Sequence, residues 1–161
     1  MKTTDKYVFF WNGIYSQWYL RDMVVDGIKY NCCEQYMMHQ KALLFNDFQT
    51  ASDILNESDP SEQKKLGRKV INFDPVKWNL VAKDFVTKGN MAKFTQNPDL
   101  KRSLLNTNER FFVEASPYDT IWGIGMHETD NGVEDPKNWK GTNWLGECLD
   151  KVKENINYGS I

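Results

Sequence analysis

The feature that most constrains this fold is a series of helix-forming segments that fills the middle of the chain. From Asn31 to Leu44, good helix formers follow an Asn that can cap the helix and a Glu three residues later. Further helices are predicted at 48–55, at 61–70, from Pro75 onward, and at 100–105 after a break at 97–99. A chain organised in this way folds mainly through helix packing.

The helix that begins near Pro75 carries its own apolar stripe. Its members Trp78, Val81, Phe85 and Ala92 recur at spacings of three, four and seven, which places them on one face of a helix. We expect this face to be buried.

Short β elements flank the helical region. The apolar run 8–11 ends at Asn12-Gly13 and predicts a strand followed by a turn. Asp26-Gly27 predicts a two-residue hairpin, because both residues of such a turn need positive φ. A strand is predicted at 111–113 and a closing amphipathic helix at 145–156. We predict a mostly α (α+β) protein, a single compact helical domain that spans residues 1–161.

Composition narrows the class of protein. Hydrophobic residues make up 40% of the 161 residues, which is typical of a globular chain rather than a disordered one. A chain with a formal net charge of -2 lacks the extended basic surface that binds a long phosphate backbone. We therefore expect any nucleic-acid contact to be local. No apolar run approaches the ~20 residues of a membrane span. We expect a cytoplasmic protein with no membrane contact and no obligate protein partner.

The cysteines and histidines offer little chemistry by their spacing. The three cysteines, two of them adjacent, do not have the spacing of a disulfide framework. They also lack the Cys-x-x-Cys spacing of a zinc site, so we expect no bound metal. His39 lies about a third of a turn from the helix stripe described next, and His127 lies in a polar loop. We therefore expect surface or hydrogen-bonded histidines rather than catalytic bases.

One helix face combines charge with apolar side chains. Glu34, Met38, Lys41 and Phe45 are spaced four, three and four apart, so they form one narrow stripe on the helix that follows Asn31. Charges inside an apolar stripe indicate a carboxylate and an amine in a partly desolvated cleft. The alternative is a half-exposed helix whose lysine reaches water over its methylenes. Spacing alone leaves both interpretations open.

A second cluster follows the strand at 111–113. Residues 114–125 bring carboxylates, Trp122 and two glycines together, at the start of a long segment rich in Gly, Pro, Asn and Asp. Glycine allows a backbone to approach a ligand closely, and an indole offers a flat face to a base. The alternative is a structural turn with a tryptophan in the core. The cluster lacks a dinucleotide fingerprint and a phosphate loop.

The two clusters together resemble the NADAR (YbiA-like) family. The resemblance lies in Tyr15-Ser16-Gln17-Trp18, Gly27-Ile28-Lys29-Tyr30, the helix 34–42, Gly67-Arg68, Lys93-Phe94-Thr95-Gln96, Leu104-Leu105-x-Thr107, Val113-Glu114, Asp119-x-x-Trp122-Gly123-x-Gly125 and Gly141-x-Asn143-x-Leu145-Gly146, in this order from about Tyr7 to Val152. Two departures are Gln17, where the family usually has Asn, and a longer loop at 128–140.

The resemblance implies a compact, mostly helical N-glycosidase that needs no cofactor. Members of the family cleave early riboflavin-pathway intermediates or remove ADP-ribose from modified guanine bases in nucleic acid. The implied substrate is therefore a small ribosyl phosphate or an ADP-ribosylated base. A module that binds ADP-ribose or a nucleotide without turnover remains the alternative.

The resemblance also implies roles for individual residues. Lys41 attacks the anomeric carbon and forms a Schiff base, Glu34 shuttles protons, and Asp119 holds the ribose hydroxyls or acts as a second acid/base. Substrate-binding roles fall to Ser16, Gln17, Trp122, Gly123 and Asn143, with Trp122 stacking on the base and Gly123 close to a phosphate.

Overall fold

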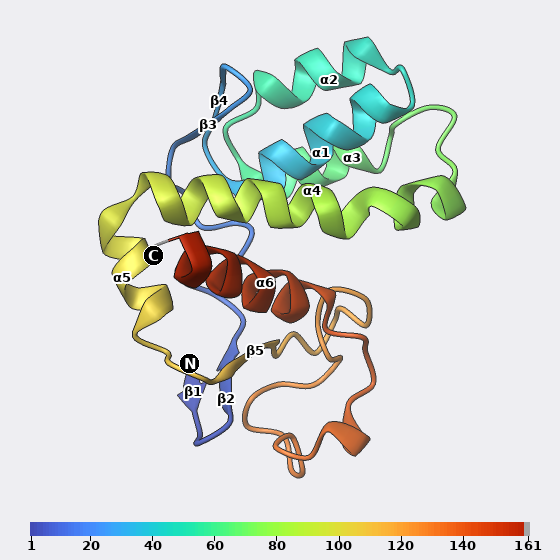
Figure 1. Ribbon diagram of the computed structural model, residues 1–161. Coiled ribbons are helices and arrows are strands. Elements are labelled where there is room, and N and C mark those ends of the chain that lie inside the picture. Colours follow the sequence, from blue (N-terminus) through green and yellow to red (C-terminus); the bar gives the residue numbers. More distant parts are fainter. Residues whose placement is uncertain (160–161) are drawn as a thin grey trace. The chain divides into compact units, whose positions relative to one another are not determined.

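The computed structural model describes residues 1–159, which form six α-helices, five short strands and one 3-10 turn (Figure 1). Packing divides the chain into two compact units. Unit 1 combines residues 1–16 with the chain from Asn97 onward, and unit 2 comprises Gln17–Gln96. The mostly helical α+β class predicted from the sequence is confirmed. A single domain over the whole chain stays a prediction.

Unit 2 begins with the predicted hairpin. Strands β3 (Met23–Val25) and β4 (Ile28–Tyr30) pair antiparallel, with Met23 opposite Tyr30. Asp26 and Gly27 have φ values of 52° and 81°, the left-handed conformation that a two-residue turn needs. The hairpin prediction is therefore confirmed.

Four helices complete unit 2, and one of them is central. The helices are α1 (Cys33–Leu44), α2 (Phe48–Leu55), α3 (Pro60–Gly67) and α4 (Pro75–Gln96). The other three all pack against α1. Residues 33–39 of α1 are buried without interruption. The first two turns of α1 therefore have no exposed face, whereas Lys41 and its neighbours near the end of the helix are partly buried.

Two predicted helix boundaries in unit 2 were wrong. Asn31 does not cap α1; Cys32 does, and its Sγ accepts a hydrogen bond from the Gln35 backbone N–H. The Asn31 side chain instead donates to the Ser58 carbonyl, so a tertiary contact competes with the cap. Helix α3 ends at Gly67 rather than at residue 70.

The predicted apolar stripe of α4 was also wrong. Trp78 is buried, but Val81, Phe85 and Ala92 are only partly buried. The fully buried face is rotated and consists of Trp78, Ala82, Val86, Gly89, Asn90, Lys93 and Phe94. Two polar side chains point inward on this face, which an apolar pattern does not predict.

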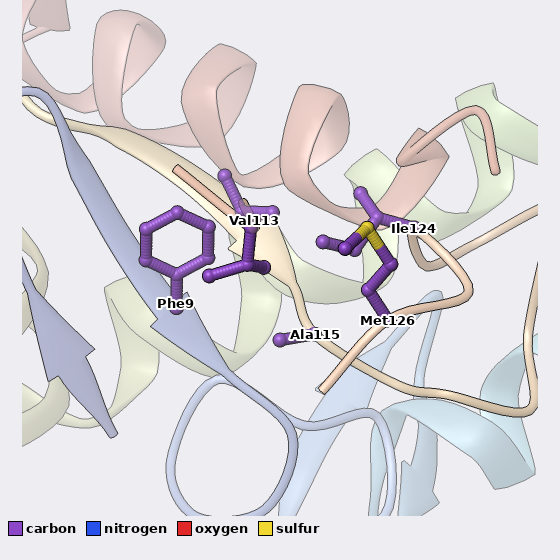
Figure 2. Close-up of a cluster of buried hydrophobic side chains, with 6 residues drawn as sticks. Phe9, Val113, Ala115, Ile124 and Met126 are labelled. Atoms are coloured by element: carbon purple, nitrogen blue, oxygen red, sulfur yellow. The ribbon is translucent and has the colours of Figure 1, made fainter. Parts of the chain in front are cut away.

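Unit 1 is built on a three-stranded sheet. Strand β2 (Tyr7–Phe10) lies between β1 (Lys2–Thr3), to which it is antiparallel, and β5 (Phe111–Glu114), to which it is parallel. The sheet joins segments about a hundred residues apart. Figure 2 shows part of the core beside it, made by Phe9, Val113, Ala115, Ile124 and Met126. Val133 belongs to the same cluster.

The outer edge of β5 is closed by side chains rather than by another strand. Helix α6 (Trp144–Gly159) packs against β5, and the Phe112 N–H donates to Asp150 Oδ1 at 2.9 Å. Asn143, just before α6, donates from Nδ2 to the Phe112 carbonyl and accepts at Oδ1 from the Glu114 N–H, both at 2.9 Å. These bonds satisfy a strand edge that would otherwise stay unpaired.

The remaining elements of unit 1 are α5 (Pro98–Leu105), which contacts α6, and the short 3-10 turn η1 (Pro136–Asn138). Within residues 1–159 none of the helices combines the length and apolar character needed to span a bilayer.

Glycine has opposite roles in two helices of this fold. A Cβ at Gly146 in α6 would overlap the Phe112 carbonyl oxygen of β5, so Gly146→Ala is expected to destabilise the protein by about 1–3 kcal/mol. A Cβ at Gly89 in α4 meets the Tyr36 ring at an ordinary 3.4 Å, so Gly89→Ala is expected to stabilise it by up to ~1 kcal/mol. Urea unfolding of both variants checks this, and equal effects would contradict the packing described.

Asp150 makes the stability of unit 1 depend on pH. Burial raises the pKa of its carboxyl to about 6, whereas an unfolded Asp titrates near ~3.9. Between these two pKa values the folded state binds the proton more tightly than the unfolded state does. The free energy of unfolding therefore decreases as pH rises, and the whole decrease is reached above about pH 6. Asp150→Asn keeps an acceptor for Phe112 but cannot ionise. We expect its stability relative to the native chain to increase from pH 4 to pH 7 in urea unfolding; a constant difference would refute the shift.

Candidate functional site

The charged stripe of α1 lies in the interior of unit 2. Glu34, Met38 and Phe45 are each 6–7% exposed, and Lys41 is partly buried. Gly67 allows the end of α3 to approach this stripe, because a Cβ there would overlap Met38 Sδ. The carboxylate and the amine are therefore both withdrawn from water on one helix face, and a cleft that they share stays a prediction.

The Lys41 amine has a perturbed environment. Burial lowers its pKa; the charge of Glu34 acts against this decrease, and the Arg68 guanidinium adds to it. Its Nζ lies 4.4 Å from the centroid of the Phe73 ring. A lowered pKa increases the fraction of neutral amine at physiological pH, which is the form that attacks carbon.

Gln17 joins the start of α1 through its backbone and α4 through its side chain. Its carbonyl accepts from the Glu34 N–H at 3.0 Å, and its Oε1 accepts from Asn90 Nδ2 at 2.8 Å. Asn90 Nδ2 also donates to the Val86 carbonyl, while Gln17 Nε2 and Asn90 Oδ1 are buried without a hydrogen-bond partner. Buried amide atoms in this state are uncommon and costly, which singles out this pair next to Glu34.

The other titratable groups of unit 2 are less suited to catalysis. His39 is 4% exposed, its Nδ1 is 2.8 Å from the Tyr30 hydroxyl, and burial lowers its pKa. Burial raises the pKa of the Cys32 thiol to about 12 and that of Cys33 to about 11, so neither forms a thiolate readily. Across residues 1–159, three or more His, Cys, Asp or Glu side chains are nowhere grouped as metal ligands.

In unit 1, Asp119 organises the loop that carries Trp122. Its Oδ1 accepts from the backbone N–H groups of Ile121 at 2.9 Å and Trp122 at 2.8 Å. Its own carbonyl accepts from the Gly125 N–H at 3.0 Å. The Asp119 side chain therefore has a structural task in the turn, in addition to the ribose contact predicted for it.

The glycines of this loop permit close backbone packing. A Cβ at Gly123 would lie 2.9–3.0 Å from the carbonyl oxygens of Glu114 and Asp119, and a Cβ at Gly141 would overlap the Gly123 carbonyl. The Trp122 carbonyl accepts from the Leu145 N–H at 3.1 Å. The segments around Trp122 and before α6 therefore run in direct contact, which fixes the backbone on both sides of the indole.

Trp122 meets one further aromatic side chain. Its ring lies 5.5 Å from that of Trp144, edge to face. Trp122 is partly buried and the neighbouring Ile121 is exposed, so the indole lies near the surface of the loop rather than in the centre of a core. A contact between the indole and a ligand stays a prediction.

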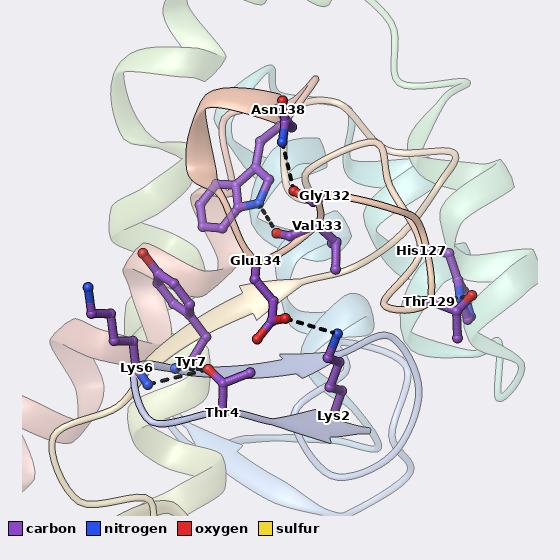
Figure 3. Close-up of polar contacts among 11 residues, drawn as sticks. Lys2, Thr4, Lys6, Tyr7, His127, Thr129, Gly132, Val133, Glu134 and Asn138 are labelled. Atoms are coloured by element: carbon purple, nitrogen blue, oxygen red, sulfur yellow. Dashed lines mark hydrogen bonds and ion pairs between the residues drawn. The ribbon is translucent and has the colours of Figure 1, made fainter.

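The long segment after the glycines is also held by specific contacts. Figure 3 shows Asn138 donating to the Gly132 carbonyl, and Lys2 of β1 paired with Glu134 at 3.7 Å. The Trp139 indole N–H donates to the Val133 carbonyl at 2.7 Å. His127 contacts Thr129 through Nδ1 at 2.7 Å. The segment has no regular structure beyond η1, but its own side chains hold it in place.

The predicted site residues thus fall into two groups. Gln17, Glu34 and Lys41 lie together in unit 2, while Asp119, Trp122, Gly123 and Asn143 lie together in unit 1, which also contains Ser16, whose N–H donates to the Gly13 carbonyl. Both amide atoms of Asn143 bind β5, which gives it a structural role. A common site of the two groups, and the substrate contacts of each residue, stay predictions.

Sequence reasoning missed two residues of unit 2. Phe73 contacts Lys41, but nothing in its local sequence marks it, because it lies between two helices. Asn90 contacts Gln17 from the interior of α4. Asn is disfavoured inside helices, so its presence there was the one signal that could have been used.

Comparison with known proteins places this geometry in a family. Residues 6–157 match the model of the NADAR domain. The N-glycosidase R617 of Acanthamoeba polyphaga mimivirus is 44% identical over 165 residues, covering 94% of this chain and 96% of the viral protein. Protein irg-1 of Caenorhabditis elegans is 44% identical over 131 residues, covering 80% of this chain; this chain spans 62% of the nematode protein.

A solved structure agrees with these matches. The NMR structure of the Escherichia coli protein YbiA matches with a TM-score of 0.80 and 26% identity, covering 99% of this chain and 89% of that chain. The E. coli protein is named N-glycosidase YbiA.

The two roles of Asp119 can be separated by substitution. Asp119→Ala removes an acceptor shared by two backbone N–H groups and is expected to cost about 1–3 kcal/mol in urea unfolding. Asp119→Asn keeps Oδ1 and is expected to keep most of that stability while losing any function of the charge. Asp130→Asn is the matched control, because Asp130 accepts from the His127 N–H in the same unit but has no predicted substrate role. Equal losses of stability in Asp119→Ala and Asp119→Asn would contradict the turn assignment.

Proposed function

This chain belongs to the NADAR domain family, and we propose that the bond it hydrolyses joins a nitrogen base to a ribose phosphate or an ADP-ribose unit. Its mimiviral and E. coli relatives are named N-glycosidases, enzymes that hydrolyse sugar–nitrogen bonds. N-glycosidase is therefore the class of this enzyme, and the sugar and the mechanism are the finer part of the proposal.

One observation carries the proposed mechanism: α1 holds a buried carboxylate and an amine of lowered pKa on the same face. Cleavage of a ribosyl–nitrogen bond needs a nucleophile for the anomeric carbon and a proton for the departing base. Lys41 and Glu34 have the chemistry for these two tasks. We assign the proton transfers to Glu34 because its side chain is buried on the same helix face and its charge acts on Lys41.

The first half of the reaction exchanges the base for Lys41. The neutral Lys41 amine forms a bond to the anomeric carbon while the carbon–nitrogen bond to the base breaks. The base leaves with the bonding electrons and takes a proton from the Glu34 carboxyl, and Glu34 recovers a proton from the new Lys41 nitrogen. Glu34 then gives this proton to the ring oxygen of the ribose as the bond between the anomeric carbon and the ring oxygen breaks. The ring opens and leaves a protonated Schiff base on Lys41.

Water completes the cycle. It adds to the Schiff-base carbon, the carbon–nitrogen bond to Lys41 breaks, and the sugar leaves as its aldehyde, which closes to the ring form. The balance is one water consumed for one free base and one free sugar. Asp119 is proposed to hold the ribose hydroxyls or to act as a second acid/base. Trp122 is proposed to stack on the base, with Gly123 close to a phosphate.

The remaining assignments concern binding. Ser16, Gln17 and Asn143 are proposed to contact the substrate. For Gln17 the support is its place beside Glu34 and its Nε2, a donor with no partner within the protein. An acceptor on the sugar or its phosphate would satisfy this donor.

Covalent trapping tests the proposal. Borohydride added during turnover reduces a Schiff base to a stable amine, so mass spectrometry should find the sugar attached to Lys41. Lys41→Arg keeps the charge but not the nucleophile and is expected to abolish the adduct and turnover. Glu34→Gln should lower turnover by about 10²- to 10⁴-fold. Lys29→Arg, on the exposed hairpin, is the control and should retain both.

Two substrates separate the finer alternatives. A ribosylamine phosphate of the riboflavin pathway and ADP-ribosylated guanine in DNA or RNA are each incubated with the protein, and chromatography detects the freed base. Release from one of them identifies the sugar. Full activity of Lys41→Arg would rule out the covalent role, and saturable binding without any released base would favour the non-catalytic binding module.

A further inference from the structure

The loop between α3 and α4 holds an aromatic ring against the Lys41 amine. The Lys41 Nζ lies 4.4 Å from the centroid of Phe73, within the range of a cation–π interaction. Phe73 is 42% exposed and Lys41 is partly buried. The ring is therefore accessible, and its face lies against the Lys41 amine.

The position of Phe73 is determined by contacts from the end of α1. Asp47 Oδ2 accepts from the Ile71 N–H at 3.0 Å, which ties the loop to the residues that follow α1. Asn72 then turns the chain with a φ of 57°. The Phe73 ring meets Phe45 edge to face at 5.4 Å. Two contacts and one turn therefore hold the ring next to the helix that carries Lys41.

An aromatic face distinguishes the two protonation states of an amine. The ring quadrupole attracts an ammonium group, whereas a neutral amine gains little from the same position. Two charges also act on the ammonium: Glu34 on α1 attracts it, and Arg68, just after α3, repels it. Lys77 of α4 lies 5.6 Å from the neighbouring Phe45 ring and adds another positive charge to this region.

We propose that Phe73 is a positioning residue for Lys41: its ring face holds the resting ammonium, and loss of the proton releases the amine toward its target carbon. The Phe73 ring thus limits the rotamers of the long, flexible Lys41 side chain until the amine loses its proton and becomes a nucleophile. The contact between Phe73 and the ammonium depends on residues of unit 2 alone. The identity of the target carbon is the part of this proposal that rests on the proposed N-glycosidase function.

Chemical modification tests the proposal without any substrate. The rate at which an excess of acetic anhydride acetylates Lys41 is followed by mass spectrometry from pH 7 to pH 11, and its midpoint reports the proton equilibrium of the amine. Phe73→Leu keeps an apolar cover but removes the quadrupole, so the midpoint should fall by about half a pH unit. Phe73→Trp, with the stronger ring, should keep it at or above the native value.

The matched control is Phe48→Leu, which changes a phenylalanine that is 64% exposed at the start of α2. Its midpoint should equal that of the native chain. A native midpoint in Phe73→Leu, or an equal shift in Phe48→Leu, overturns the proposal.

Turnover distinguishes this proposal from the proposed function. If the native enzyme releases base from a ribosyl substrate, the acidic limb of its pH–rate profile should move in Phe73→Leu by the same amount as the acetylation midpoint. If the native enzyme releases no base from either substrate, the proposed function fails, and the acetylation midpoints still decide the role of Phe73.

Discussion

The burial of α1 is the constraint on which unit 2 depends. Its first turns have no exposed face, so each polar side chain there needs a partner inside the protein. Gln35 Nε2 donates to the carbonyls at the end of α2, including that of Ile54 at 3.0 Å. Gln63 on α3 accepts from the Cys32 thiol at 3.1 Å. These bonds attach the neighbouring helices to α1 in one arrangement, because an unpaired group there would cost about 1–3 kcal/mol.

This arrangement also explains the lowered pKa of Lys41 in the charged stripe. The contacts that bury α1 remove water from the Lys41 amine, which lowers its pKa, while Glu34 on the same face limits the decrease. The lowered pKa of Lys41 therefore follows from the packing that stabilises unit 2, and substitutions that loosen this packing are expected to alter both the pKa and the stability.

Sequence patterns predicted those elements that local interactions determine. The hairpin at Asp26-Gly27 follows from the positive φ of its turn, and α2 spans the predicted residues 48–55, with Asp47 as a cap that was not predicted. The errors arose where tertiary partners decide the outcome. The buried face of α4 includes Asn90 and Lys93, which are buried because Gln17 accepts from one and the Tyr19 ring lies 5.5 Å from the other. Hydrophobic periodicity does not predict tertiary partners of this kind. It did not identify Phe73, because the contact of Phe73 with Lys41 is also tertiary.

Unit 1 shows the same principle with neutral and acidic side chains. The Asn143 amide binds the edge of β5 as a neighbouring strand would: it donates to one backbone carbonyl and accepts from one backbone N–H. Asp119 Oδ1 accepts from two backbone N–H groups in the turn that carries Trp122. In unit 1, side chains that resemble ligand-binding groups in the sequence therefore also satisfy backbone groups. A loss of activity after their substitution therefore identifies a chemical role only when an isosteric variant keeps the backbone bonds, since deletion removes both functions at once.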